Sequence, residues 1–339
     1  MKFSFDDEQI ALAEAVARLL EKECAPEAMR SLWDDPTGRS PALRRGLAGI
    51  GLPGILVPEE HGGAAGSLLD LVLVLEEIGK ACAPDALLEA LVTGPAALAL
   101  AGSPAQRADW LPAIAAGERR VTLALHTLDS VPDAHVADVL VFADGDGLAL
   151  APTAALTLTP LRAVDPARRQ FRVEVPAGVA EPLPGGREAL PAIAALEASG
   201  SAAVLIGLSQ RMLDLTVSYA GVRVQFGRAI GSFQGVKHQL AAATVLVRMA
   251  RLAAHASAWS VATGQPDATA AARAARICAL DAEFEANRVA LQIHGGIGFT
   301  WEHDLGMWLK RGKALEQAHG GRHRLSVQAG RDALARRAS

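Results

Sequence analysis

The sequence has few of the residues that mark disulfide-stapled or metal-binding proteins. Its 339 residues include only three cysteines, Cys24, Cys82 and Cys278, which lie far apart and form no Cys-x-x-Cys pair. We therefore expect free core thiols in a reducing cytosol rather than disulfides. No cluster of His, Cys and Asp has the spacing of metal ligands, so no metal site is expected.

Aromatic residues, excess charge and long apolar runs are also scarce. Aromatic residues make up 4% of the chain and the formal net charge is −4. Because no basic stripe with interleaved aromatic residues occurs, a nucleic-acid partner is not expected. The N-terminus, MKFSFDDEQIALAEAVARLL, is acidic and amphipathic and lacks the pattern of a secretion signal. No run of about 18 uncharged apolar residues is present, so we expect a cytoplasmic protein without a membrane span.

Apolar residues, by contrast, make up half of the chain, enough for a sizeable core shared by two or three domains. Up to about Gly117 they recur at helical spacing, and Asp6 or Asp7 is placed to cap the first helix. The segment LLDLVLVLEEIGKA predicts a buried helix that ends at Gly79.

The pattern changes at Val121, where short β-prone runs replace the helical periodicity. In DVLVFADGDGLALAP two such runs flank Asp-Gly-Asp-Gly, which predicts a hairpin. From Glu188 onward apolar residues again recur three or four positions apart, as is typical of packed helices in a bundle. We therefore predict a helical domain over residues 1–120, a β domain over 121–185 and a helical bundle over 186–339.

The segment RVQFGRAIGSFQGVKHQLA joins two long helical patterns and contains several residues suited to ligand binding. Arg223 offers a forked, permanently charged donor that matches phosphate oxygens. Gln234 can donate to and accept from a sugar or a base edge. Glycines between them let a ligand approach the backbone closely. The alternative is an ordinary loop between helices with a surface arginine.

A second glycine-rich segment, LQIHGGIGFTWEHD, follows another strong helical pattern. A helix needs only one glycine to end, whereas Gly295, Gly296 and Gly298 form a group of three. Such a group indicates a backbone pressed against a flat or phosphate-bearing ligand, with Gln292 beside it. The aromatic residues of the segment are expected to structure the loop and to pack: His294, Trp301 and His303.

With these motifs the sequence resembles the acyl-CoA dehydrogenase family. The segments GLAGIGLPGILVPEEHGG, LVLEEIGKA and WLPAIAAGE match that family in order, followed by the two glycine-rich segments. The resemblance covers nearly the whole chain. It implies a mainly α-helical fold with a helical N-terminal domain, a small, reduced β-barrel domain in the centre, and a C-terminal four-helix bundle that mediates oligomerisation.

The resemblance also assigns roles to both glycine-rich segments. In the family the matching residues hold the adenosine and pyrophosphate of FAD across a subunit interface, for a flavin held mainly by the neighbouring chain. The residues of this half-site would be Arg223, Phe226, Gln234, Gln292, Gly295 and Gly296. The implied reaction is the α,β-dehydrogenation of an acyl-CoA thioester, in which a glutamate removes the Cα proton.

The position of that glutamate is unusual in this sequence. Most members carry it near the C-terminus, but counting 27 residues on from Gln292 reaches His319, and Glu316 lies one helical turn too early. A minority similar to isovaleryl-CoA dehydrogenase place the base 26 residues before the arginine of the first motif, which here is Glu197. The other interpretation makes Glu197 an ordinary exposed residue of a helix.

The β domain departs from the family pattern. In complete members a loop and a later tryptophan-containing strand hold the flavin ring. The loop is matched here only weakly, by Thr127, Asp129 and Ser130, and the stretch that should lead to the strand is missing. The chain is also shorter than complete members. We therefore do not expect it to hold the reactive ring alone. It resembles the short, degenerate subunit of bacterial α2β2 acyl-CoA dehydrogenases, some of which act on steroid side-chain CoA thioesters.

Three hypotheses follow from the sequence. In the first, the chain is one subunit of a heteromeric FAD-dependent acyl-CoA dehydrogenase and completes the FAD site of a fuller partner subunit. In the second, it is a self-sufficient homo-oligomeric enzyme with Glu197 as base. In the third, it is a catalytically silent scaffold. By resemblance, an electron-transfer flavoprotein would accept the electrons. The sequence does not identify the acyl group.

Overall fold

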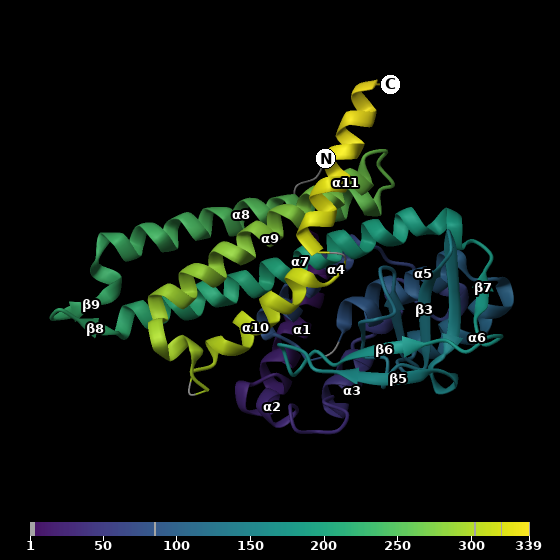
Figure 1. Cartoon of the computed structure of the whole chain (residues 1–339), viewed down its shortest axis with the longest axis horizontal. Helices are drawn as coiled ribbons and strands as arrows, with labels where there is room; N and C mark the ends of the chain where they lie inside the picture. Colours follow the sequence, from purple (N-terminus) through teal and green to yellow (C-terminus); the bar gives the residue numbers. More distant parts are fainter. Residues whose placement is uncertain (1–3, 85, 302, 320, 339) are drawn as a thin grey trace.

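The computed structural model describes residues 4–84, 86–301, 303–319 and 321–338. Three long helices, α7 (Gly186–Val222), α8 (Gln234–Ala262) and α9 (Ala268–His294), run side by side and set the long axis of the molecule (Figure 1). The small hairpin of β8 (Val224–Gln225) and β9 (Arg228–Ala229) forms one tip, and the larger sheets lie near the opposite end.

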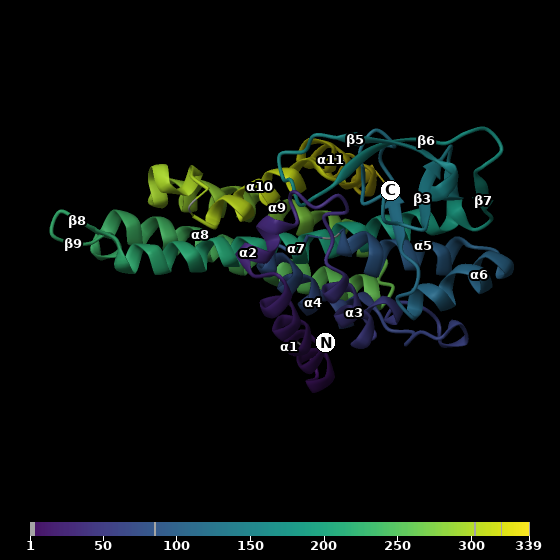
Figure 2. The same ribbon diagram turned by 90° about the horizontal axis from the view of Figure 1, so that it is seen from below.

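The N-terminal helices cover one side of this axis, whereas β5, β6 and the last two helices lie on the other side (Figure 2). As predicted, Asp6 caps the first helix: its side chain accepts from the backbone N–H of Gln9, and the Gln9 side chain accepts from the backbone N–H of Asp6. The helices of this part are α1 (Asp7–Glu23), α2 (Pro26–Ser31), α3 (Pro41–Gly49), α4 (Leu68–Ala81), the π-helix η3 (Glu89–Thr93), α5 (Gly94–Ala101) and α6 (Pro104–Ala115).

Apart from the β8–β9 hairpin, the strands form two small sheets. One has four strands in the order β1-β3-β4-β7, with β1 and β3 parallel, and the other has three in the order β2-β6-β5. The predicted hairpin is confirmed, because Asp144 at the end of β3 pairs with Gly147 at the start of β4. The strands are β1 (Val121–Ala124), β2 (Val131–Pro132), β3 (Val139–Asp144), β4 (Gly147–Pro152), β5 (Thr157–Leu161), β6 (Gln170–Glu174) and β7 (Glu181–Leu183).

Helices α4 and α7 cross with their backbones almost in contact. A Cβ atom on Gly79 would lie 2.1 Å from the carbonyl oxygen of Val204, and one on Gly207 would lie 1.8 Å from that of Glu76. The prediction that Gly79 ends its helix is therefore wrong, since α4 continues to Ala81. Gly79 is present because the crossing leaves no room for a side chain.

Alanine has the same role along the bundle, where it allows close approach of the helices. The alanines of α8 and α9 that face the core are fully buried: Ala243, Ala250, Ala254, Ala258, Ala275, Ala279 and Ala286. Helix α7 is long and apolar enough to cross a membrane by composition, but 67% of its most apolar window is buried inside the protein. It is therefore a core helix.

The chain ends in two helices. As predicted, α10 (Leu305–Gln317) follows the second glycine-rich segment, and α11 (Gly321–Ala338) then projects away from the body (Figure 1). None of the three cysteines forms a disulfide, and only Cys24 and Cys82 lie in the core. Cys278 is exposed on α9, so the prediction of a core thiol is wrong there, because that position lies outside the packed face of the helix.

The α4–α7 crossing predicts a large difference between two glycine substitutions in α7. Gly207→Ala should lower the free energy of unfolding by about 1–3 kcal/mol, because the new methyl group must push two backbones apart. Gly221→Ala, at a position with nothing within 4 Å of its Cβ, should leave stability unchanged or slightly higher. Urea denaturation of both variants measures this, and equal stabilities would contradict a backbone-limited crossing.

Candidate functional site

The first glycine-rich segment forms the tip of the bundle. Because Gln225 pairs with Arg228, the turn of the hairpin consists of Phe226 and Gly227. Both have left-handed backbones, with φ of +52° and +79°, as a two-residue hairpin turn of this type requires. A phenylalanine is strained in this conformation, and the residue as a whole is 93% exposed. Strain of this kind is typical of functional sites.

The second glycine-rich segment begins where α9 ends. Gly295 has a φ of +62° and starts the short helix η6 (Gly295–Phe299). The space that a Cβ atom would occupy is open at both Gly295 and Gly296. Gln292, one turn earlier on α9, is exposed. The backbone is therefore accessible to a ligand at this point.

An aromatic stack links the two segments. The ring of Tyr219, near the end of α7, stacks on that of His294 with 4.4 Å between centroids, and His303 meets His294 edge-on at 4.7 Å. His294 Nδ1 donates to the carbonyl oxygen of Ala290 at 2.8 Å, and burial lowers the pKa of His294. The stack thus holds the ends of α7 and α9 together, which brings both predicted patches to one end of the bundle.

The side chains predicted to bind a ligand at this end face solvent. Arg223, Gln234 and Gln292 are all exposed, and none makes a side-chain hydrogen bond within the described ranges. Their donors and acceptors are therefore available. Trp301, which was expected to pack, does contact Trp33 edge-on and lies under Lys310, although the residue remains 67% exposed.

Glu197 lies in a different environment. It is only 5% exposed, so the interpretation as an ordinary surface residue is wrong. His126 Nε2 contacts one carboxylate oxygen at 2.7 Å, and His319 Nδ1 contacts the other at 3.0 Å. His319 is the residue at which the more common position of the catalytic glutamate falls. The two candidate positions for a base therefore meet at one point of the fold.

The two histidines determine the charge of Glu197. Burial opposes its ionisation, but the positive charge of His319 and the hydrogen bonds from His126 and His319 outweigh burial and hold the pKa well below its usual value. The carboxylate is therefore ionised at neutral pH. With both oxygens engaged, it has little tendency to take up a further proton.

The cluster extends beyond Glu197. His319 Nε2 is 3.8 Å from Glu89 of the π-helix, and Arg168 donates to the same Glu89 oxygen at 3.0 Å. Arg276 donates to the backbone carbonyl of His319 at 2.8 Å and so fixes the loop that carries it. Sequence reasoning missed these partners. The only available signals were His126, next to the weak Thr127 motif, and His319 itself.

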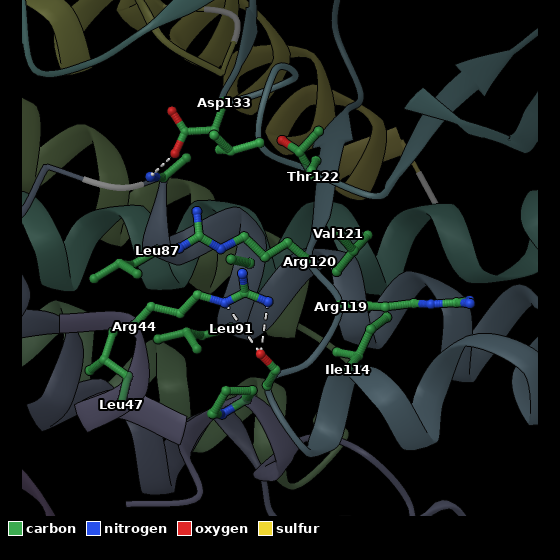
Figure 3. A pocket seen from close by; sticks show the side chains of 16 residues that line it. Arg44, Leu47, Leu87, Leu91, Ile114, Arg119, Arg120, Val121, Thr122 and Asp133 are labelled. Atoms are coloured by element: carbon green, nitrogen blue, oxygen red, sulfur yellow. Dashed lines mark hydrogen bonds between the residues drawn. The ribbon is translucent and has the colours of Figure 1, made fainter. Parts of the chain in front are cut away.

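Two cavities meet at this cluster. The larger has a volume of about 520 Å³, and the other about 330 Å³; His126, Glu197 and His319 line both. A third cavity, of about 60 Å³, lies beside η3 and β1 (Figure 3). There the guanidinium of Arg44 donates to the carbonyl of Gly117, and Asp133 accepts from a backbone amide. It is too small for an organic ligand and contains none of the predicted site residues.

The exposed tip at Arg223 and the buried carboxylate of Glu197 lie far apart along one helix, α7. Glu197 and Arg223 are separated by 26 residues of the continuous helix α7, which ends at Val222. At 1.5 Å per residue this is about 39 Å. The two ends of α7 in this chain therefore cannot both contact one reacting group.

Two family models match the chain. The acyl-CoA dehydrogenase N-terminal domain matches residues 6–118, and the acyl-CoA dehydrogenase C-terminal domain matches residues 189–328. Acyl-CoA dehydrogenase IpdE2 of Mycolicibacterium smegmatis is 38% identical over 93% of this chain and 95% of its own length. Acyl-CoA dehydrogenase IpdE2 of Mycobacterium tuberculosis is 36% identical, with 92% of each chain covered.

Solved structures give the same result for the fold. A variant of the Tcur3481–Tcur3483 steroid ACAD superposes with a TM-score of 0.90 at 27% identity, covering 98% of this chain and 99% of that one. The ChsE4–ChsE5 complex from Mycobacterium tuberculosis gives 0.88 at 25% identity, with 98% and 99% covered.

Glu197 predicts a pH-dependent contribution to stability. Because its pKa in the folded chain is lowered from 4.5, the ionised carboxylate stabilises the fold above about pH 4.5, and this stabilisation is lost as the pH falls through the folded-state pKa. Glu197→Gln should lower the free energy of unfolding at pH 7 by about 1–3 kcal/mol. The difference from the wild type should shrink between pH 5 and pH 3.

Urea denaturation across this pH range tests the prediction. Glu188→Gln is the matched control, since Glu188 is exposed in the first turn of the same helix and should change stability by less than about 0.5 kcal/mol. A deficit of Glu197→Gln that stays constant from pH 7 to pH 3 would contradict the lowered pKa.

Proposed function

The chain belongs to the acyl-CoA dehydrogenase family, and on this premise we propose that it is one subunit of a heteromeric, FAD-dependent acyl-CoA dehydrogenase. It would supply the adenosine and pyrophosphate half of a FAD site whose reactive ring is held by a partner subunit. The observation that carries the proposal is the convergence of two exposed, glycine-rich patches at one tip of the bundle, far from the buried Glu197.

The chemistry of the tip fits the nucleotide end of FAD. The Arg223 guanidinium can place two parallel donors on a pyrophosphate, and the amides of Gln234 and Gln292 can bind hydroxyl or ring atoms of adenosine. Gly295 and Gly296 leave room for the phosphates to approach the backbone. When bound, FAD supplies the acceptor for the hydride that leaves the Cβ atom of the acyl thioester.

The opposite end of α7 does not fit the flavin ring. Its larger cavity is lined by Glu89, Arg168 and Glu197, and the apolar, dimethylbenzene part of the flavin ring would have to displace or desolvate these buried charges. Ser130 of the weak clamp motif is bound to the side chain of Gln170 at 3.1 Å. A partner that seats the ring is therefore part of the proposal. Both superposed structures are named for two different proteins, Tcur3481 with Tcur3483 and ChsE4 with ChsE5, which supports a heteromeric assembly.

The substrate and surroundings follow from the same family. We infer an acyl-CoA thioester as substrate, and the similarity to a steroid ACAD favours a steroid-derived acyl group. An electron-transfer flavoprotein would take up the electrons, and the enzyme would act in the cytoplasm. The catalytic base would be provided by the partner, because both oxygens of Glu197 are engaged.

A second candidate is the self-sufficient homo-oligomer with Glu197 as base. It is favoured by one observation, that Glu197 is ionised and lines the larger cavity. The two candidates differ in what each chain must do alone. The heteromer predicts a colourless isolated chain, whereas the homo-oligomer predicts a yellow, active one.

Flavin content tests the half-site. Arg223→Ala, in the complex isolated after co-expression with the partner subunit, should weaken FAD binding roughly tenfold to hundredfold, because a charge-assisted contact to the pyrophosphate is lost. The measurement is the flavin absorbance per complex after dilution and gel filtration. Arg18→Ala, an exposed arginine of α1, is the control. Unchanged flavin occupancy in a stable Arg223→Ala complex would refute the half-site and favour the silent scaffold.

Turnover of Glu197→Gln separates the two enzymatic candidates. If Glu197 is the base, kcat should fall by roughly 10²–10⁴, since that is the usual contribution of a positioned base. In the heteromer we expect a change of less than about threefold. A dye-linked dehydrogenase assay of the intact complex measures both values, and a loss of 10² or more would overturn the assignment of the base to the partner.

A further inference from the structure

The last helix, α11, packs on the body differently from the helix before it. In α10 seven residues are buried, among them Trp308 and Leu315. In α11 none of the side chains that the structure describes, those of residues 321–334, is buried. Leu325 of α11 is half-buried and packs against the hydrophobic core. Because helices are held to a body mainly by the apolar surface that they bury, α11 is attached more weakly than α10.

Charged contacts with α9 hold α11 in place. Near the start of α11 the guanidinium of Arg322 lies 2.5 Å from a carboxylate oxygen of Asp281, and further along Asp332 pairs with Arg273. The side chains of Arg322 and Asp281 are 55% and 44% exposed. Exposed pairs of this kind contribute little to stability, and salt weakens them further, since the screening length falls from about 10 Å at 0.1 M salt to about 3 Å at 1 M.

The same helix forms part of the wall of the cavity of about 330 Å³ beside Glu197. Arg324, Leu325 and Gln328 of α11 line this cavity. Ala198 and Glu197 of α7 line it as well, and both are buried. The position of α11 therefore determines how far this cavity is open to solvent.

The segment before α11 is anchored independently of α11. Arg276 donates to the carbonyl oxygens of Ala318 at 2.5 Å and of His319 at 2.8 Å, and His319 Nδ1 contacts Glu197 at 3.0 Å. Helix α11 begins at Gly321, whose φ of +68° lies in the left-handed region that favours glycine. A change of backbone conformation at Gly321 can therefore move α11 while His319 stays in place.

From these contacts we propose that α11 is a lid over the Glu197 cavity. In the closed state, which the structure shows, the two ion pairs with α9 hold the lid down. Screening or loss of these pairs lets α11 turn about Gly321 and uncovers the cavity, while Arg276 keeps His319 against Glu197. The lid controls access to Glu197, and it acts in the same way whichever subunit holds the flavin ring.

The reactivity of a cysteine inside the cavity tests the lid in the full-length chain. Ala198→Cys places a thiol on the cavity wall at a position that is 4% exposed, and Cys278→Ser removes the exposed native thiol. The rate at which iodoacetamide alkylates the new thiol, followed by mass spectrometry, should rise about fivefold or more between 50 mM and 1 M NaCl. Cys82, buried in the core, is the internal control and should stay unreactive at both salt concentrations.

Substitutions of one ion pair provide matched variants of the Ala198→Cys chain. At 50 mM NaCl, Arg322→Asp should raise the alkylation rate about fivefold or more, because two negative charges then face each other. Adding Asp281→Arg restores the pair with opposite polarity and should return the rate to within about twofold of its starting value. Arg331→Ala should leave the rate unchanged, since Arg331 is exposed on α11 and forms no ion pair with another described residue.

Two outcomes would overturn the proposal. The first is an alkylation rate of the Ala198→Cys thiol that neither salt nor Arg322→Asp changes. The second is a rise that Cys82 shares, because the whole chain then opens rather than α11 alone. If Ala198→Cys itself makes Cys82 reactive at low salt, Ala194→Cys, which lines the same cavity one turn earlier on α7, is the reporter on which both outcomes are judged.

Discussion

The rigidity of α7 is the constraint on which the rest of the molecule depends. This helix runs unbroken for 37 residues, and Gly207 fixes it against the backbone of α4. Because neither end can move independently, Glu197 and the tip at Arg223 keep a fixed separation. Everything attached to the two ends must serve different tasks. The tip presents polar side chains to the outside, and the other end encloses a network of charges.

That enclosed network surrounds Glu197, the residue that the sequence offered as a catalytic base. A lone buried carboxylate would be strongly destabilising, and His126 and His319 compensate it from segments that lie far apart in the sequence. The same contacts use the lone pairs that proton abstraction requires. His319 thus has two effects. It stands where most family members carry the catalytic glutamate, and its ring nitrogen contacts a carboxylate oxygen of Glu197, the other candidate base. Arg276 and Arg168 then hold the surrounding loops in place.

The sequence predicted features that depend on local chemistry. The cap at Asp6, the turn after Asp144 and the course of α7 each follow from neighbouring residues, and all three were confirmed. The prediction for Gly79 was wrong because a glycine that ends a helix cannot be distinguished in the sequence from one that lets a second helix pack closely. The pairing of His126 with Glu197 could not be predicted, since it depends on how a β domain docks on a distant helix. The FAD roles of the tip residues remain predictions.

The hairpin tip has a consequence for how cofactor and assembly are linked. Phe226 lies almost wholly in solvent at this tip, and in the proposed half-site it would form one wall of a binding site that the partner subunit completes. A molecule clasped between two such walls joins them, so its affinity and the affinity of the chains for each other are thermodynamically coupled. Dilution would release the dinucleotide as the chains part, and saturation with it would hold them together at concentrations where they otherwise separate.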